Sequence, residues 1–153
     1  MTDYGLLIEQ AVELTRDIPY ETANLANLSA LIFDGLEKVN WAGFYELKGD
    51  KLVLSCFQGK PACVILPLSR GVCAEAVRTG SVVNVPDVHA FSGHIACDSA
   101  SASEIVLPLN DPSGKVKYVL DIDSPVRSRF TAEDEAGLTK LARAIERILF
   151  PAG

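Results

Sequence analysis

Apolar side chains recur roughly every three or four positions between residues 4 and 17, and again between residues 22 and 38. Because an α-helix turns once in about 3.6 residues, side chains with this spacing line one face of a helix. A third segment with the same spacing runs from residue 131 to residue 149. It begins with Thr131, a residue type that caps helix N-termini. The pattern therefore predicts two helices at the start of the chain and one at its end.

Between these helices the apolar pattern changes to that of extended strands. Residues 40–47 and 51–56 flank a three-residue segment, 48–50, that contains glycine, and this arrangement is typical of a β-hairpin. A short helix is predicted over residues 71–79, and Gly80 ends it. Four further strands are predicted at residues 62–66, 82–85, 104–109 and 115–122. Six strands between terminal helices predict an α+β fold with helices packed on an antiparallel sheet.

The length of 153 residues fits one domain, because domains typically have roughly 50–200 residues. We expect the domain to span residues 1–153, with N-terminal helices in 1–38, the sheet in 40–123 and the C-terminal helix in 131–149. Residues 86–102 show neither hydrophobic period, and loops of this length in compact domains are usually functional. We therefore expect an active-site loop there.

The charge balance narrows the classes of partner. The chain carries 14 Lys and Arg residues against 20 Asp and Glu residues, which gives a net charge of −6. Nucleic acids and anionic membranes bind basic surfaces, so this balance argues against both as partners. The longest apolar runs are about five residues, whereas a membrane-spanning helix needs about 20. The first residues lack the basic start and apolar stretch of a signal peptide, which predicts a cytoplasmic location.

Four cysteines are unusual in such a chain, because cytoplasmic thiols stay reduced and rarely form structural disulfides. Their spacing gives no close Cys-x₂₋₄-Cys pair of the kind found in structural zinc sites. The arrangement His89-x₄-His94-x₂-Cys97 also matches no common zinc pattern, so the sequence predicts no metal site. The plainest interpretation is that all of the cysteines are small buried apolar residues. They are Cys56, Cys63, Cys73 and Cys97.

Strand alternation places unusual side chains together. Trp41 and Tyr45 fall on one face of their predicted strand, and Asp121 and Asp123 fall on one face of the last strand. Glu104 opens the strand before it. One interpretation is a solvated strand end, with Asp123 starting a turn. The other is an acidic pocket with an aromatic wall, which would bind a small cation bearing an apolar arm. Clustered carboxyl groups cannot all ionise easily, so one should have a raised pKa and could serve as a general acid.

The predicted loop supplies a nucleophile next to this pocket. Cys97 lies seven residues before Glu104, and His94 three residues before Cys97 could help to activate its thiol. The neighbouring acidic groups would oppose that activation, because they disfavour a thiolate. A further thiol, either Cys63 or Cys73, would have to approach Cys97 to resolve an oxidised form.

Seven segments of the chain, in order and spread over nearly its whole length, resemble the free methionine-(R)-sulfoxide reductases, which are stand-alone GAF-domain enzymes. Two of these segments are specific to that family. They are Gly-His-Ile-Ala-Cys-Asp at residues 93–98 and Leu-Asp-Ile-Asp-Ser at residues 120–124. The other segments cover residues 40–45, 57–63, 71–73, 87–89 and 103–109. The resemblance implies a single GAF domain with a six-stranded antiparallel sheet.

The resemblance also implies a role for each functional residue. Cys97 matches the attacking cysteine, Cys63 matches the cysteine that resolves its sulfenic acid as a disulfide, and Cys73 matches a third cysteine that can join the exchange. Cys56 lies outside the family pattern and is interpreted as a bystander. The substrate-binding residues implied by the family are Trp41 and Tyr45 in the aromatic wall, and Glu104, Asp121 and Asp123 in the acidic cluster.

The substrate implied by the resemblance is free L-methionine-(R)-sulfoxide, whose ammonium group would pair with the acidic cluster. Glu104 or Asp123 would protonate the sulfoxide oxygen as Cys97 attacks sulfur. No bound cofactor is implied. The electrons would come from an external dithiol, thioredoxin, and indirectly from NADPH. Related domains often pair through their terminal helices, so a homodimer is also compatible with the resemblance.

Two other functions fit the same residues. A GAF module that senses a small molecule would need the pocket but would leave three cysteines unexplained. A thiol redox sensor would use Cys97 and a resolving thiol, but it would have no need of the acidic groups or of Trp41.

Overall fold

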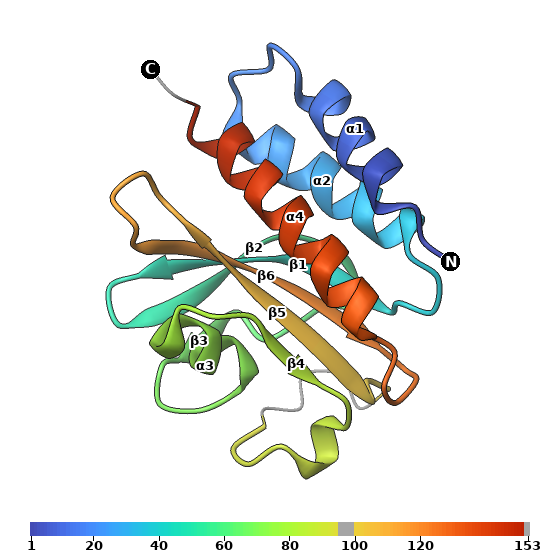
Figure 1. The fold of residues 1–153 in the computed structure, drawn as a ribbon. Helices are drawn as coiled ribbons and strands as arrows, with labels where there is room; N and C mark the ends of the chain where they lie inside the picture. The colour runs from blue at the N-terminus through green and yellow to red at the C-terminus, as the bar shows by residue number, and fades with distance from the viewer. Residues whose placement is uncertain (95–99, 152–153) are drawn as a thin grey trace.

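The computed structural model describes residues 1–94 and 100–151 (Figure 1). Within these ranges the chain forms four α-helices, one short 3₁₀ helix and six strands. The helices are α1 (Tyr4–Thr15), α2 (Glu21–Gly35), α3 (Val72–Thr79), the 3₁₀ helix η1 (Val88–Ala90) and α4 (Ala132–Leu149). The strands are β1 (Trp41–Lys48), β2 (Lys51–Gly59), β3 (Ile65–Pro67), β4 (Val83–Val85), β5 (Ser103–Asn110) and β6 (Val116–Ser124). None of the helices in the described part of the chain combines the length and apolarity that a bilayer-spanning helix requires.

The six strands form one sheet in the order β3-β2-β1-β6-β5-β4, and each neighbouring pair is antiparallel. Strands β1 and β6, which are far apart in the sequence, are paired at the centre of the sheet. The predicted α+β fold with a six-stranded antiparallel sheet is therefore confirmed.

Helices α1, α2 and α4 lie on one side of the sheet, whereas α3 lies on the other side (Figure 1). Alternate strand residues supply a core to each side, because successive side chains in a strand point to opposite faces. The helix-side core joins side chains of α2 and α4 to Ile105, Leu120 and Ile122 of the strands. The opposite core contains Trp41 and Tyr45 together with side chains of α3. Both faces of the central strands are therefore buried.

Two local predictions differ from the structure. Lys48 pairs directly with Lys51, so the hairpin loop has the two residues Gly49 and Asp50 rather than three. Gly49 adopts a positive φ of 64°, a conformation that a tight turn requires and that glycine adopts without strain. Strand β3 is also shorter than predicted and starts at Ile65, although the carbonyl of Val64 still accepts a hydrogen bond from the Leu54 amide at 2.8 Å.

Gly43 allows β1 and β2 to approach closely at an irregularity in their pairing. The register between the two strands shifts between Gly43 and Tyr45. A Cβ atom on Gly43 would lie 2.3 Å from Cβ of Phe57, which is far inside van der Waals contact. The ring of Phe57 stacks on Trp41 with centroids 5.2 Å apart. The absence of a side chain at Gly43 therefore lets Phe57 support the aromatic residues of β1.

We predict that Gly43→Ala destabilises the protein by about 1–3 kcal/mol, the usual penalty for inserting a methyl group into a packed core. The measurement is the free energy of unfolding in urea. Gly5→Ala in α1 is the control, because its Cβ would meet no atom closer than 3.4 Å. A Gly43→Ala variant within about 0.5 kcal/mol of the unchanged protein would contradict the close packing described.

Candidate active site

The register of three neighbouring strands brings the acidic residues together. Asp123 of β6 lies opposite Trp41 of β1 on one side and opposite Glu104 of β5 on the other. Asp121, two residues earlier on β6, lies opposite Gly43. Because residues two apart in a strand share a face, all of the acidic side chains project to the same side of the sheet. That side is opposite the helix-side core.

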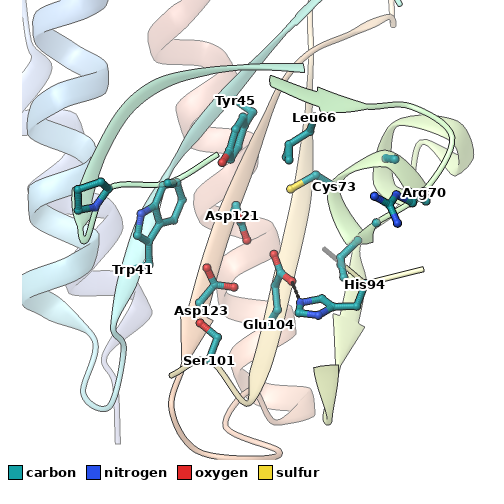
Figure 2. Close-up of a pocket in the computed structure, with 15 residues that line it drawn as sticks. Trp41, Tyr45, Leu66, Arg70, Cys73, His94, Ser101, Glu104, Asp121 and Asp123 are labelled. Atoms are coloured by element: carbon teal, nitrogen blue, oxygen red, sulfur yellow. Dashed lines mark ion pairs between the residues drawn. The ribbon is translucent and has the colours of Figure 1, made fainter. Parts of the chain in front are cut away.

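These residues form the wall of one pocket, and Figure 2 shows their side chains converging on it. Cys73 of α3 and His94 lie close to Glu104, on the side of the acidic side chains away from Trp41 in Figure 2. The predicted site residues that line this pocket are Trp41, Tyr45, Cys73, Glu104, Asp121 and Asp123. The structure therefore brings together six residues from four different elements.

Two hydrogen bonds fix the aromatic side of the pocket. Nε1 of Trp41 donates to the carbonyl of Lys60 at 3.1 Å, and the hydroxyl of Tyr45 donates to the carbonyl of Cys63 at 2.9 Å. The two rings stack with their centroids 6.0 Å apart. The ring positions are therefore set by the segment that carries Cys63, and the rings offer an apolar surface to the cavity.

Glu104 is the strongest candidate for a proton donor. Only 7% of its surface is exposed. Burial raises its pKa well above the ordinary value, and the negative charges of Asp121 and Asp123 raise it further. Both effects favour the protonated form of this carboxyl group, which is the form that a general acid needs.

Asp121 and Cys73 form a second buried pair. Asp121 is 6% exposed and Cys73 is 5% exposed. Burial raises the pKa of the Cys73 thiol, and the charge of Asp121 adds to that effect. Burial also raises the pKa of Asp121, although close polar contacts with Glu104 and Cys73 partly offset it. Cys73 is therefore held as a neutral thiol rather than as a nucleophilic thiolate.

Reasoning from the sequence missed several other side chains of the pocket wall. Leu66, Arg70 and Ser101 are among them. No local sequence signal marks them, because their positions depend on how α3 and the chain before it pack against the sheet. His94 was considered as an activator of Cys97, as a member of a zinc pattern and as a residue of the loop, but not as a neighbour of Glu104. Its Nε2 lies 4.0 Å from Oε1 of Glu104, and burial, together with the charge of His89, lowers its pKa.

The described cysteines differ in oxidation state. Cys63 is half-buried and is in a disulfide bond, whereas Cys56 and Cys73 are free thiols. Cys56 packs against the helix-side core, away from the pocket, as expected of a bystander. Cys97, the predicted nucleophile, lies outside the described residues.

Comparisons with known proteins agree with this architecture. The GAF domain family matches residues 22–149. Free methionine-R-sulfoxide reductase of Escherichia coli is 56% identical over 127 residues, which cover 83% of this chain and 76% of that protein. The structure of the reduced form of fRMsr of Staphylococcus aureus has a TM-score of 0.93 and 46% identity, covering 97% of this chain and 96% of that chain. Free methionine-R-sulfoxide reductase of Neisseria meningitidis, solved with its substrate, has a TM-score of 0.90 and 39% identity, covering 95% and 87%.

We predict that the raised pKa of Glu104 makes stability depend on pH. The folded state binds this proton more tightly than the unfolded chain does, so the stabilisation is complete below the ordinary pKa of 4.5 and declines as pH rises above it. The expected decline is at most about 1.4 kcal/mol per pH unit for one proton. Glu104→Gln cannot ionise and should show a flatter dependence when urea unfolding is measured from acidic to neutral pH.

The control for this experiment is Glu9→Gln, because Glu9 is an exposed residue of α1. It should retain the pH dependence of the unchanged protein. Parallel curves for Glu104→Gln and the unchanged protein would show that Glu104 does not hold the extra proton.

Proposed function

We propose a reaction for this chain, which belongs to the free methionine-R-sulfoxide reductase family of GAF-domain proteins. The protein reduces free methionine-(R)-sulfoxide to methionine. The observation that carries this function is the single pocket in which Glu104, Asp121 and Asp123 face Trp41 and Tyr45. A sensing module would need such a pocket but no redox cysteine beside it, and Cys63 is in a disulfide next to the aromatic wall.

The residue types of the pocket match the parts of the substrate. Methionine sulfoxide carries an ammonium group, an apolar arm and a polar S=O group. Trp41 and Tyr45 enclose the methyl-sulfoxide end, while the carboxyl groups attract the ammonium group. A methionine sulfoxide within a peptide has no free ammonium group. We therefore infer that the acidic cluster selects the free amino acid.

Glu104 supplies the proton that makes the sulfoxide oxygen a leaving group. Its burial and its raised pKa support this role over Asp123, which is only half-buried. The negative charge of Asp121 raises the pKa of Glu104 and so keeps the proton on Glu104 until the substrate binds. Transfer of the proton to oxygen then accompanies attack on sulfur, where negative charge would otherwise build up on the oxygen.

The proposed chemistry balances with two thiols. The Cys97 thiolate attacks the sulfoxide sulfur, the S–O bond breaks as the oxygen passes to Cys97, and methionine leaves while Cys97 becomes a sulfenic acid. Cys63 attacks that sulfenic acid and forms a disulfide with release of water. Thioredoxin then reduces the disulfide by exchange, with NADPH as the ultimate electron donor. These steps require a reducing compartment, so we propose that the protein works in the cytoplasm.

Cys63 resolves the sulfenic acid in this scheme rather than Cys73. The disulfide state of Cys63 supports the assignment, as does the free thiol of Cys73. Burial and the nearby carboxylates raise the pKa of Cys73, which makes it a slow nucleophile at neutral pH. Cys73 can still join later exchange if the pocket opens.

We also propose that α1 belongs to the same domain, so that residues 1–153 form one unit. The family match begins at residue 22, after α1. However, Leu7 and Ala11 of α1 are buried in the helix-side core. A homodimer through the terminal helices stays a prediction of the resemblance.

The activity is tested by adding free L-methionine-(R)-sulfoxide to the protein with thioredoxin, its reductase and NADPH. We expect NADPH to be consumed as methionine forms. Cys97→Ser should abolish the reaction, and Cys56→Ser, which changes the bystander thiol, should not. An absence of NADPH consumption with the free substrate would refute the reductase function, and activity in Cys97→Ser would refute the nucleophile.

We predict that Cys63→Ser forms one equivalent of methionine per protein and then stops, because the sulfenic acid has no resolving thiol. A dimedone-type reagent followed by mass spectrometry should label that sulfenic acid. Cys73→Ser should continue to turn over with thioredoxin. The reverse result, with Cys73→Ser arrested after one turnover and Cys63→Ser active, would assign resolution to Cys73 instead.

We predict that N-acetyl-methionine-(R)-sulfoxide is reduced roughly ten- to a hundredfold less efficiently than the free amino acid. The reason is that acetylation removes the charge that pairs with the carboxyl groups, and charged hydrogen bonds contribute about 1.5–3 kcal/mol. The readout is kcat/KM from methionine release. The methyl ester, which keeps the ammonium group, is the matched control and should retain more of the efficiency. Equal values for the acetylated and free substrates would contradict the role of the acidic cluster.

A further inference from the structure

Three metal-ligating side chains meet at the centre of the pocket. The sulfur of Cys73 and carboxylate oxygens of Glu104 and Asp121 all lie within 4.8 Å of one another, and all three residues are buried. They come from three elements, α3, β5 and β6. The sequence predicted no metal site, because the spacing of its cysteines and histidines matches no common zinc pattern. The cluster of Cys73 with two carboxyl groups is produced by the fold instead.

A second observation favours a cation at this cluster. Oδ1 of Asp121 is buried and has no hydrogen-bond partner among the described residues. This oxygen belongs to a side chain that lines the pocket and is only 6% exposed. A buried carboxylate oxygen without a partner costs free energy, and a bound cation removes that penalty.

A fourth donor lies at the edge of the cluster. Nε2 of His94 is 4.0 Å from Oε1 of Glu104, and Figure 2 shows the imidazole facing that carboxyl group. Burial favours the neutral imidazole, which is the form that binds metals. The pocket thus presents a thiol, an imidazole and two carboxyl groups, which is a donor set that suits zinc.

We propose that Zn²⁺ binds in this pocket to Cys73, Glu104, Asp121 and His94. Zinc takes four ligands at about 2.0–2.3 Å, which places neighbouring ligand atoms roughly 3.3–3.8 Å apart. The separations of up to 4.8 Å among Cys73, Glu104 and Asp121 exceed these values, and His94 lies outside that cluster, so binding requires these side chains to move toward the ion. Binding displaces the protons of the Cys73 thiol and the Glu104 carboxyl group, which pass to the solvent, and no oxidation or reduction takes place.

The bound ion also competes with the substrate, a consequence that rests on the proposed function. Zn²⁺ occupies the position from which the carboxyl groups would attract the substrate ammonium group. It also takes the proton from Glu104, the proposed general acid. The pocket therefore holds either the metal or methionine sulfoxide, and zinc inhibits the reductase by exclusion.

Cobalt replaces zinc as a spectroscopic probe in the experiment. The protein carries Cys63→Ser and Cys97→Ser, so the remaining cysteines are Cys56 and Cys73. Titration with Co²⁺ should produce a sulfur-to-cobalt charge-transfer band and the visible bands of tetrahedral cobalt. Zn²⁺ should then remove these bands at one equivalent per protein. No turnover is needed, so the result does not depend on whether the reductase reaction is correct.

Four variants in this background, two at proposed ligands and two as controls, test the ligand assignment. Cys73→Ser should eliminate the charge-transfer band, whereas Cys56→Ser, the matched thiol control, should leave it unchanged. His94→Gln should weaken zinc binding by at least roughly tenfold. Loss of a residue that only supports a metal ligand already lowers metal affinity by about 10–100-fold, and loss of a ligand should cost no less. His89→Gln is its matched control, because His89 is exposed on η1 and should bind zinc unchanged.

Several results would overturn the proposal. A charge-transfer band that persists in Cys73→Ser would place the metal elsewhere. An octahedral cobalt spectrum without that band, or equal zinc affinities for His94→Gln and His89→Gln, would also contradict the site. Excess methionine-(R)-sulfoxide should bleach the cobalt bands in this background, and a spectrum that is unchanged by substrate would refute the competition.

Discussion

The antiparallel pairing of β1 with β6 is the constraint on which the other features of this protein depend. It joins two segments that are about 80 residues apart and fixes which side chain faces which layer. In this register Leu120 and Ile122 enter the helix-side core, while Asp121 and Asp123 enter the pocket. A slip of one residue would exchange these sets and bury carboxyl groups among leucines. Because Leu120 and Ile122 must lie on the helix side of the sheet, the register places Asp121 and Asp123 on the pocket side.

The pocket is built at a cost to stability that the rest of the domain must offset. Glu104 and Asp121 are buried, the charge of Asp121 disfavours ionisation of Glu104, and the neutral thiol of Cys73 lies close to both. The central strands are covered on both faces, so apolar burial around Ile105 and Leu120 stabilises the sheet that carries these groups. The same strands thus supply both the destabilising site and the core that tolerates it.

Much of the fold was predictable because hydrophobic period and turn residues are local signals. Alternation alone placed Trp41 with Tyr45 and Asp121 with Asp123, and the structure puts these pairs in one pocket. The strand order was not predictable, because nothing local in β1 encodes pairing with β6. The approach of Cys73 to Asp121 depends likewise on the docking of α3. The acidic cluster was therefore predicted, whereas the close approach of Cys73 and His94 to its carboxyl groups was recognised only in three dimensions.

The hydrogen bonds that hold the aromatic wall have a thermodynamic consequence. Tyr45 donates to the carbonyl of Cys63 and Trp41 donates to the carbonyl of Lys60, so both rings are positioned by the chain segment that carries the disulfide-bonded cysteine. Any shift of this segment when the disulfide opens would alter the positions that these hydrogen bonds set for the two rings. Ligand affinity and reduction potential are then linked functions, and linkage is reciprocal. If the ligand binds the dithiol form more tightly than the disulfide form, bound ligand stabilises the dithiol form. The free energy by which oxidation becomes harder equals the difference between the two binding free energies.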